Sequence, residues 1–252
     1  MQWISAYNKR KDLFMEKETL YIIIPAYNEQ DTIAKVVTDW YPILDAYGNE
    51  DSKMVILDDG SKDNTYKILK QLEHDYPKLA PVHKSNSGHG ATIRFGYQIA
   101  LDCHADYIFQ TDSDGQTLPS EFKDFWQKRN NYDMLVGWRK HRQDGFSRKL
   151  VTKTLKAAIK CCFHVTIPDA NTPYRLINYH TLKTCMNFIP ENYNLTNVLL
   201  SVICEKKQYK TTYLPITFLP RQGGINSINL RKIFKIGIQA VKDFRNLNQI
   251  IS

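Results

Sequence analysis

The chain has 252 residues, of which 42% are hydrophobic and 12% aromatic, so it can bury the core of one α/β domain or of two small ones. Its formal net charge of +8 favours anionic partners such as nucleotide phosphates, a membrane surface or nucleic acid. Nucleic acid is the weakest of these choices, because the sequence has no RNA-binding or zinc-finger signature and its aromatic residues are not interleaved with a basic strand.

Membrane spans, secretion and disulfides are not indicated either. No apolar run reaches the roughly 18 residues that a bilayer span needs, and residues 1–17 lack the apolar centre of a secretory signal. The five cysteines are odd in number and contain no Cys-x-x-Cys pair, which suggests neither a zinc site nor a disulfide framework. We therefore expect a cytosolic protein.

Apolar, β-branched runs alternate with amphipathic segments along the first half of the chain. The sequence predicts strands at residues 20–25, 54–57, 81–84, 106–110 and 133–136. The segments between them predict helices that reach about residues 40, 74, 100 and 129. This alternation is typical of an α/β fold with a mainly parallel sheet covered by helices on both faces.

The alternation ends after Arg139. The later segments predict a long basic helix at residues 146–163, an irregular stretch at 167–177, a helix at 193–204, a strand at 211–218 and a final helix at 229–250. The final helix carries both apolar and basic residues. It either packs its apolar stripe on the domain or lies on a membrane surface as a basic amphipathic helix.

Polar clusters follow four of the predicted strands, at residues 25–29, 58–61, 86–91 and 111–116. Ligands bind at the carboxyl edge of open α/β sheets, so these clusters predict one site. In the last cluster Asp112 and Asp114 stand one residue apart beside Gly115, and their oxygens suit Mg²⁺ or Mn²⁺ bound together with phosphates. A turn with Asp and Gly is common after a strand. A functional interpretation is favoured by the ordered series of four polar clusters.

The order and spacing of these clusters resemble a family 2 glycosyltransferase, nearest to the branch of dolichyl-phosphate mannose synthase and bacterial polyprenyl-phosphate sugar synthases. The resemblance runs from about residue 20 to 227 and includes VGWR at 136–139, DANTPYRL at 169–176, and Arg221, Gly224 and Ser227. It implies the GT-A (Rossmann-like) fold: a mainly parallel sheet with helices on both faces, a C-terminal helical and irregular acceptor region, and a terminal amphipathic helix. We expect a single domain with a nucleotide-sugar half at about 20–140, an acceptor half at about 141–228 and the helix at about 229–252.

A nucleotide-sugar donor presents a flat base, a ribose and two phosphates. The residues predicted to bind it are Pro25, Ala26, Tyr27, Glu29, Asp59, Gly88, Asp112, Ser113 and Arg221. Asp59 can accept a hydrogen bond from an imide N–H of uracil or the corresponding edge of guanine, and Glu29 can hold a ribose hydroxyl or a cation. Tyr27 and Glu29 also suit ordinary packing at the start of a helix.

The resemblance also implies a metal site. Asp114 and Gln116 resemble the DxD aspartate and the following glutamine that bind the metal in this branch, and Asp112, which faces the sugar or ribose, is a third candidate ligand. A cation that bridges the diphosphate stabilises the departing nucleoside diphosphate. Arg221 resembles a C-terminal arginine that folds over the diphosphate. His89 can touch phosphate from its loop, although a surface or capping role is more common.

The predicted acceptor contacts are Arg139, Arg148, Thr152 and Arg175, and the predicted catalytic set is Asp112, Asp114, Arg139 and Asp169. Guanidinium groups take phosphate oxygens in bidentate pairs. Arg148 and Thr152 share one helical face and resemble the clamp on the acceptor phosphate. Arg148 can instead belong to the solvated face of a basic helix.

The nature of the acceptor depends on a general base. A polyprenyl phosphate is already anionic, whereas a sugar hydroxyl needs a nearby carboxylate to take its proton. Asp169 is the best candidate for such a base, but it can equally pair with Arg175, and Glu191 is weaker. No acidic ED-type motif lies between residues 136 and 193, which favours the lipid phosphate. Two departures leave the acceptor open: the chain shows no C-terminal spanning helix, and residues 171–173 replace the branch's usual Ser-Gly or Cys-Gly.

The sequence thus predicts a metal-dependent glycosyltransferase that uses a UDP- or GDP-linked sugar and a polyprenyl-phosphate acceptor, peripherally bound at the cytosolic face of a membrane. Inversion of the anomeric centre is implied by the resemblance alone. The alternatives are transfer to a saccharide hydroxyl in surface-polysaccharide synthesis and a non-catalytic sugar-nucleotide-binding protein. A nucleotidyltransferase would carry a glycine-rich basic loop after its first strand, whereas residues 25–30 are neither rich in glycine nor basic.

Overall fold

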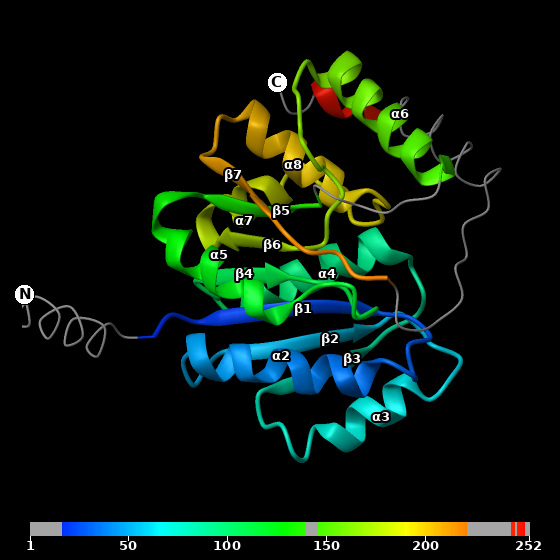
Figure 1. The fold of residues 1–252 in the computed structure, drawn as a ribbon, viewed down its shortest axis with the longest axis vertical. Helices are drawn as coiled ribbons and strands as arrows, with labels where there is room; N and C mark the ends of the chain where they lie inside the picture. Colours follow the sequence, from blue (N-terminus) through cyan, green and yellow to red (C-terminus); the bar gives the residue numbers. More distant parts are fainter. Residues whose placement is uncertain (1–16, 140–145, 221–242, 245, 250–252) are drawn as a thin grey trace, which may run out of the picture.

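A seven-stranded sheet organises the computed structural model, which describes residues 17–139, 146–220, 243–244 and 246–249, with the backbone alone for 146–151. The strand order is β3-β2-β1-β4-β6-β5-β7 (Figure 1). The strands are β1 (Leu20–Ala26), β2 (Lys53–Asp58), β3 (Leu79–His83), β4 (Tyr107–Gln110), β5 (Met134–Trp138), β6 (Arg175–Asn178) and β7 (Thr211–Pro215). Neighbouring strands are parallel except where β6 pairs with β4 and β5. The expected mainly parallel α/β sheet is confirmed.

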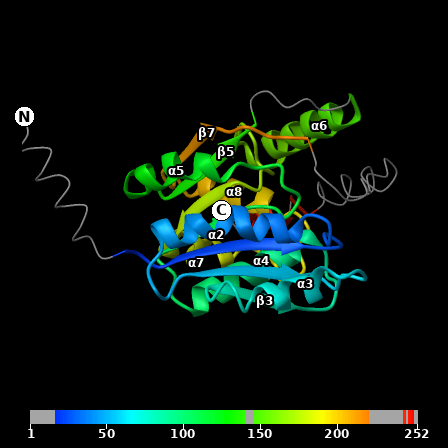
Figure 2. The same ribbon diagram turned by 60° about the horizontal axis from the view of Figure 1, so that its bottom comes forward.

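Helices cover both faces of the sheet (Figure 2). They are α2 (Ile33–Tyr47), α3 (Thr65–Leu72), α4 (His89–Asp102), α5 (Phe122–Lys128), α6 (Phe146–Phe163), α7 (Tyr179–Met186) and α8 (Thr196–Lys206), with 3-10 turns η1 (Pro119–Glu121) and η2 (Arg129–Asn131). Because side chains alternate along a strand, Ile22 and Ile24 of β1 pack in a core with Trp40 of α2, whereas Ile23 packs in a second core with Tyr97 of α4. The first core also takes in α5, and the second α7 and α8.

Strand β6 and helix α7 correct the prediction for the chain after Arg139. Residues 167–177 were expected to be irregular, yet Arg175–Asn178 form a strand between β4 and β5, and α7 follows directly. The strand has four residues and begins with a charged one, so the chain is too short there to display an alternating pattern. Its place is determined by pairing with two neighbours on the sheet.

Only part of the predicted final helix falls among the described residues. Residues 243–244 and 246–249 are helical, and Phe244 lies in the second core, with its ring centroid 5.0 Å from that of Phe163. The described part therefore packs its apolar side chains on the domain. Within the described ranges, no helix combines the length and apolar character that crossing a bilayer demands.

Gly96 lets α4 lie directly on the sheet. A Cβ atom at this position would come within 2.5 Å of Cγ2 of Ile23 and 2.7 Å of Cδ1 of Leu57, which are too close for any larger residue without displacement. On the same helix, the Tyr97 hydroxyl donates to Oε1 of Gln110 at 3.0 Å. These contacts fix α4 beneath β1, β2 and β4, and so fix the position of its first residue, His89, near the carboxyl ends of these strands.

Candidate active site

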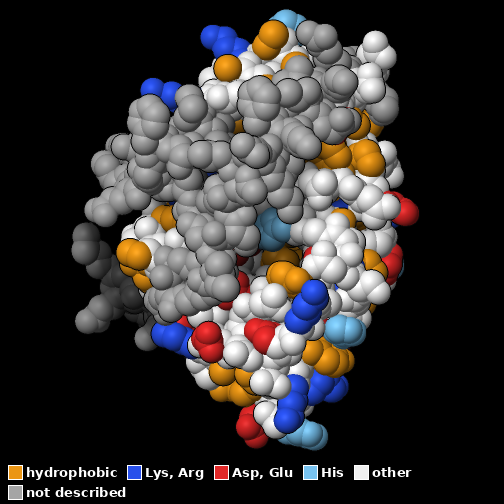
Figure 3. Space-filling model, turned by 90° about the vertical axis from the view of Figure 1, so that its right-hand side faces the viewer, with side chains coloured by type: hydrophobic (Ala, Val, Ile, Leu, Met, Phe, Trp, Pro, Cys, Tyr) orange, Lys and Arg blue, Asp and Glu red, His pale blue; other side chains and the backbone are white. Residues whose placement is uncertain are grey.

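The loops that follow β1, β2, β3 and β4 line one cavity of about 440 Å³. Its lining residues are Pro25, Ala26, Tyr27, Glu29, Asp59, Asn86, Gly88, His89, Thr92, Asp112, Ser113 and Asp114. Figure 3 shows the molecule from the side on which these strands end, where acidic side chains lie around a hollow in the surface. The structure thus brings eight of the nine residues predicted to bind the nucleotide sugar to one place, and the ninth, Arg221, lies outside the described residues.

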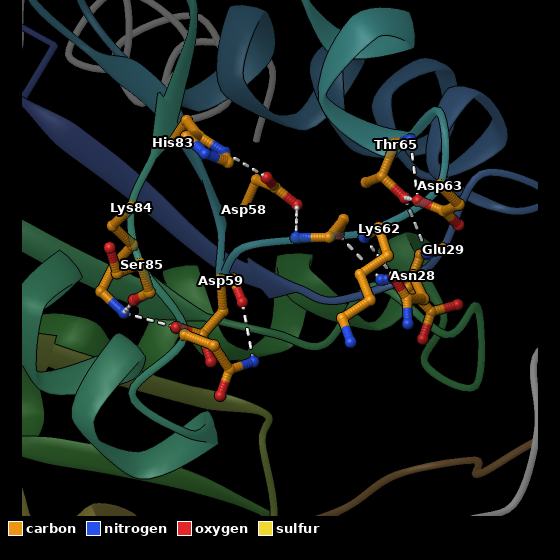
Figure 4. Close-up of polar contacts among 12 residues, drawn as sticks. Asn28, Glu29, Asp58, Asp59, Lys62, Asp63, Thr65, His83, Lys84 and Ser85 are labelled. Carbon is orange, nitrogen blue, oxygen red and sulfur yellow. Dashed lines mark hydrogen bonds and ion pairs between the residues drawn. The ribbon is translucent and has the colours of Figure 1, made fainter.

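The loop after β1 is held by the loop after β2 (Figure 4). Asn28, in the left-handed region with φ of 54°, donates its N–H to Oγ of Ser61 at 2.9 Å and accepts from the N–H of Lys62 at 2.8 Å. Glu29 donates its N–H to Oγ1 of Thr65 at 2.8 Å. The Glu29 carboxylate, which is nearly buried, accepts from Oγ1 of Thr32 at 3.0 Å. The position of Glu29 is therefore determined by the fold.

Asp59 organises the glycine-bearing loop before α4. Its carboxylate accepts from the N–H groups of Ser87 and Gly88, both at 2.9 Å, and forms an ion pair with Lys84. Burial alone would raise the pKa of Asp59, but the bonds from Lys84 and from the N–H of Ser87 outweigh it, so the pKa lies below its ordinary value. Asn86 also donates to the Asp59 carbonyl at 2.8 Å.

Ser113 connects the loop after β4, which carries the predicted metal ligands, to the loop after β1. Its hydroxyl donates to the carbonyl of Pro25 at 2.9 Å, and its own carbonyl accepts from Oγ1 of Thr32 at 3.2 Å. With Ser113 turned inward, Asp112 and Asp114 border the cavity on either side of it. Oδ1 of Asp112 is buried and has no hydrogen-bond partner among the described residues, and Nε2 of His89 lies 3.7 Å from it.

Gln116 connects this loop to the segment after β7. Its N–H donates to Oδ1 of Asp114 at 3.2 Å, and its side-chain amide donates to the carbonyl of Leu219 at 2.6 Å. The Leu219 N–H returns a bond to the Gln116 carbonyl at 2.8 Å. The chain therefore comes back to the edge of the site two residues before Arg221.

The carboxylates fit a divalent cation that is shared with a ligand. Among the described residues no group of three or more His, Cys, Asp or Glu side chains is arranged to hold a metal by itself. Asp112, with its unpartnered buried oxygen, and the neighbouring Asp114 are the kind of ligands expected for Mg²⁺ or Mn²⁺. These ions bind few protein carboxylates and complete their coordination with water and phosphate. The amide nitrogen of Gln116 is occupied by Leu219, so its side-chain oxygen is the atom available to a cation.

Arg139 and Asp169 form a bidentate ion pair beyond the end of β5. Nε of Arg139 lies 2.8 Å from Oδ2 of Asp169, and Nη2 lies 2.9 Å from Oδ1. Both side chains are largely buried, and the ring of Phe218 lies over the guanidinium with 4.9 Å between its centroid and Cζ. Both oxygens of Asp169, the candidate base, therefore accept from Arg139, the residue that was predicted to bind a phosphate.

Arg175 is a structural residue and not an exposed acceptor contact. Its side chain is fully buried and donates to the carbonyls of Thr172 at 2.8 Å and Ala170 at 2.6 Å, and to Oγ of Ser201 at 2.9 Å. The expectation that it touches the acceptor is therefore wrong for this structure, because no part of it is open to a ligand. It holds the loop that carries Asp169, whose ion pair is with Arg139.

The other predicted acceptor residues lie on α6. Thr152 is half-buried and Arg148 precedes it by one helical turn, so the backbone places both on one face. The Arg148 side chain lies outside the described residues.

The site's arrangement agrees with comparisons to known proteins. The family model described as Glycosyl transferase family 2 matches residues 21–190. The chain belongs to glycosyl transferase family 2. The match covers β1 to α7, and therefore every described loop of the cavity.

Several curated relatives that are similar in sequence are named for lipid-phosphate acceptors. The chain is 31% identical over 154 residues to a UDP-N-acetylglucosamine–dolichyl-phosphate N-acetylglucosaminyltransferase of Methanococcus voltae, covering 55% of this chain and 59% of that protein. It is 27% identical over 168 residues to an undecaprenyl-phosphate 4-deoxy-4-formamido-L-arabinose transferase of Shewanella sediminis, covering 66% and 50%. A dolichyl-phosphate beta-glucosyltransferase of Trichomonas vaginalis is 23% identical over 249 residues, covering 87% and 69%. The chain thus spans half to about two thirds of the length of these relatives.

Solved structures share the fold of this family 2 member. Glucosyl-3-phosphoglycerate synthase of Mycobacterium tuberculosis, in complex with Mn²⁺, uridine diphosphate and glucosyl-3-phosphoglycerate, superposes with a TM-score of 0.67 at 14% identity, covering 92% of this chain and 80% of that one. Its complex with phosphoglyceric acid gives the same TM-score at 15% identity. The likeness confirms the GT-A type of fold.

Two neighbours of the predicted residues were not found from the sequence of this family 2 member. Lys84 follows β3 directly and bonds to Asp59 and to Oγ of Ser87, and a lysine placed just after a strand is the signal that could have identified it. Phe218 contacts Arg139 from a segment 79 residues later (218 − 139). Such a contact depends on how β7 pairs with β5 and leaves no local pattern.

Proposed function

We propose that this protein transfers a sugar from a nucleoside diphosphate sugar to a polyprenyl phosphate, with inversion at the anomeric carbon. An oxygen of the acceptor phosphate forms the new bond to the anomeric carbon, and the bond from that carbon to the diphosphate oxygen breaks. The observation that carries the proposal is the convergence of four strand-end loops, with Asp59 and Asp112, on one cavity. The names of the relatives, which specify dolichyl or undecaprenyl phosphate, support the acceptor.

The donor half of the cavity suits a nucleoside. Tyr27 is one of two large exposed hydrophobic residues among the described residues and lines the cavity beside Pro25 and Ala26, so its ring can cover a base. Asp59 is held rigidly as an anion, which suits acceptance from an imide N–H. Asp114 and Gln116 would hold Mg²⁺ or Mn²⁺, and the bound ion would offset the charge that develops on the departing diphosphate. Mn²⁺ accompanies uridine diphosphate in the structurally similar synthase.

The acceptor half suits an anion better than a hydroxyl. A hydroxyl acceptor needs a base able to take its proton, and both oxygens of Asp169 instead accept from Arg139. The Arg139 guanidinium, held between Asp169 and the Phe218 ring, uses Nε and Nη2 on Asp169, and the proposal assigns its remaining N–H groups to the acceptor phosphate. A phosphate needs no deprotonation and can accept from these groups.

The exposed face of α6 would meet the membrane that carries the lipid. Residues 146–163 contain no Asp or Glu, and Lys153, Lys156 and Lys160 are exposed. Lysines on one helical face attract an anionic membrane surface, at about 1 kcal/mol each. We assign this face to the cytosolic leaflet, where the nucleotide sugar is available.

A panel of donors and acceptors tests the function. UDP-glucose, UDP-N-acetylglucosamine and GDP-mannose are each offered with undecaprenyl phosphate or an oligosaccharide, in Mg²⁺ or Mn²⁺. The proposal predicts a lipid-linked sugar that extracts into organic solvent. Product with the oligosaccharide alone would refute the acceptor, and a protein that binds these donors without any turnover would refute the enzyme.

Vesicle binding tests the assignment of α6. We expect the triple variant Lys153→Glu/Lys156→Glu/Lys160→Glu to bind phosphatidylglycerol vesicles at least tenfold more weakly than the unaltered chain in low salt. The matched control Lys35→Glu/Lys67→Glu/Lys70→Glu makes the same charge change at exposed positions of α2 and α3, on the other face of the sheet. Equal weakening by both variants would show that net charge, and not α6, governs binding.

A further inference from the structure

The described C-terminal residues, 243–244 and 246–249, connect the ends of two helices; we call them the C-terminal segment. Phe244 is fully buried, and its ring centroid lies 5.0 Å from that of Phe163, the last residue of α6. Asn248 accepts a hydrogen bond from Nζ of Lys206, the last residue of α8. Figure 1 shows the segment in red beside α6. It therefore contacts α6 and α8 at once.

Helix α6 packs on the domain near its C-terminal end. Among its described side chains, Ile159 and Phe163 are the buried ones, and both lie in the second core with residues of α8. Residues 152–158 are half-buried or exposed. At a rise of 1.5 Å per residue, Arg148 and Thr152 lie roughly 23 and 17 Å from Phe163 along the helix axis. A small change in the angle of the packed end is therefore a large displacement of these two residues.

Phe244 contributes to the packing of that end. Truncating a buried phenylalanine leaves a cavity that the surrounding structure fills only in part. The contact between the two rings adds to the effect of burial. Because the partner ring belongs to the last residue of α6, the loss of Phe244 would loosen this helix first.

The donor cavity is built from other elements. Its lining comes from the loops after β1 to β4 and from the first turn of α4. No described residue of α6 or of the C-terminal segment belongs to that lining. A change at Phe244 would therefore alter the position of α6 and leave the walls of the donor cavity in place.

We propose that Phe244 is a positioning residue for the acceptor. By holding the end of α6 against α8, it fixes the places of Arg148 and Thr152, the two α6 residues predicted to bind the acceptor phosphate. It also fixes the direction of the exposed lysines of α6. The inference rests on the proposed function, because it takes a lipid phosphate as the acceptor.

Hydrogen–deuterium exchange of the ligand-free chain tests how α6 is held. We expect Phe244→Ala to speed the exchange of the backbone amides of residues 152–163 about tenfold, and that of β1 and α4 less than twofold. Phe244→Leu keeps most of the apolar volume and should speed the exchange of α6 about threefold, so it carries the test if Phe244→Ala does not fold. The matched control Phe125→Ala truncates a buried phenylalanine of the first core, on the other face of the sheet, and should not change the exchange of α6.

Steady-state kinetics tests the consequence for the acceptor. In Phe244→Ala we expect the KM for undecaprenyl phosphate to rise about tenfold, with kcat at saturating acceptor changed less than twofold. The dissociation constant of the best donor's nucleoside diphosphate, measured by calorimetry in Mn²⁺, should also change less than twofold. Phe244→Leu should recover most of the loss in KM.

Three results would overturn the inference while leaving the proposed function intact. Unchanged exchange of α6 in both variants would show that Phe244 does not hold this helix. Equal acceleration in α6, β1 and α4 would show that Phe244 stabilises the fold as a whole. Faster exchange of α6 with an unchanged KM would refute the role in acceptor positioning. If the unaltered chain forms no lipid-linked sugar with any donor, the proposed function fails and the acceptor role with it, whereas the exchange measurement still decides whether Phe244 holds α6.

Discussion

Three carboxylates near the candidate site occupy three different environments. Asp59 accepts from a lysine and two backbone N–H groups, and Asp169 gives both oxygens to Arg139. Asp112 keeps a buried oxygen that no described residue satisfies. Asp59 thus holds its loop in place and also lines the cavity, Asp169 holds Arg139 in place, and Asp112 lines the cavity where a ligand would lie.

Asp114 should be essential to turnover. We expect Asp114→Ala to lower kcat at least a hundredfold and to weaken donor binding in Mg²⁺ or Mn²⁺, because the ion would lose its carboxylate next to the diphosphate. Steady-state kinetics with the best donor of the panel measures this. Asp124→Ala, which removes an exposed carboxylate from α5, is the control. Unchanged activity of Asp114→Ala would eliminate the metal assignment.

Asp59 should stabilise the fold in a pH-dependent way. Its pKa is lower in the folded chain than its ordinary value of 3.8, so its stabilisation is complete above about pH 3.8 and is lost as the pH falls through the folded pKa. At pH 7 we expect Asp59→Asn to lower the free energy of unfolding by about 1–3 kcal/mol, since Lys84 loses its ion pair and the loop its charged acceptor.

Thermal or urea unfolding of the unaltered chain and of Asp59→Asn between pH 7 and pH 3 tests this pH dependence. The difference in unfolding free energy between the two proteins should narrow below about pH 3.8, because the unfolded chain takes up a proton at Asp59 more readily than the folded one. A difference that stays constant to pH 3 would show that the charge of Asp59 is not what stabilises the loop.

At the scale of elements, local pattern and long-range pairing account for different parts of the structure. The repeated strand, polar loop and helix over residues 20–136 could be predicted, because each strand is a buried apolar run that ends at polar residues. Asp59, Asp112 and Asp114 could be predicted with it, since each follows such a run. Strand β6 could not, because its four residues are placed by β4 and β5. The contact of His89 with Asp112 depends on the tilt and depth of α4, which no local pattern encodes.

The depth of α4 rests on Gly96. Although alanine favours a helix over glycine by about 1 kcal/mol, we expect Gly96→Ala to destabilise the protein by about 1–3 kcal/mol, because its methyl group would overlap Ile23 and Leu57. Denaturant unfolding measures the change. In a double-mutant cycle, Ile23→Ala should reduce the cost of Gly96→Ala by making room for the methyl group. A stabilised Gly96→Ala variant would mean that α4 does not need this close approach.

Across the whole molecule, the sheet brings distant segments to one edge. The loops after β1 to β4 line the cavity, Arg139 follows β5, and the segment after β7 returns to Gln116 through Leu219. Phe218 from that segment also covers Arg139. The segment after β7 therefore contacts both Gln116, beside the proposed donor cavity, and Arg139, on the proposed acceptor side.

The claim that a phosphate oxygen receives the sugar can be tested with two acceptors that differ in that group alone. Undecaprenyl phosphate and undecaprenol are each incubated with the best donor and the metal, and glycosylated lipid is quantified by mass spectrometry. We predict product from undecaprenyl phosphate and none from undecaprenol, because Arg139 favours an anion and Asp169, bound to Arg139, is not available as a base. Comparable product from undecaprenol would contradict transfer to a phosphate.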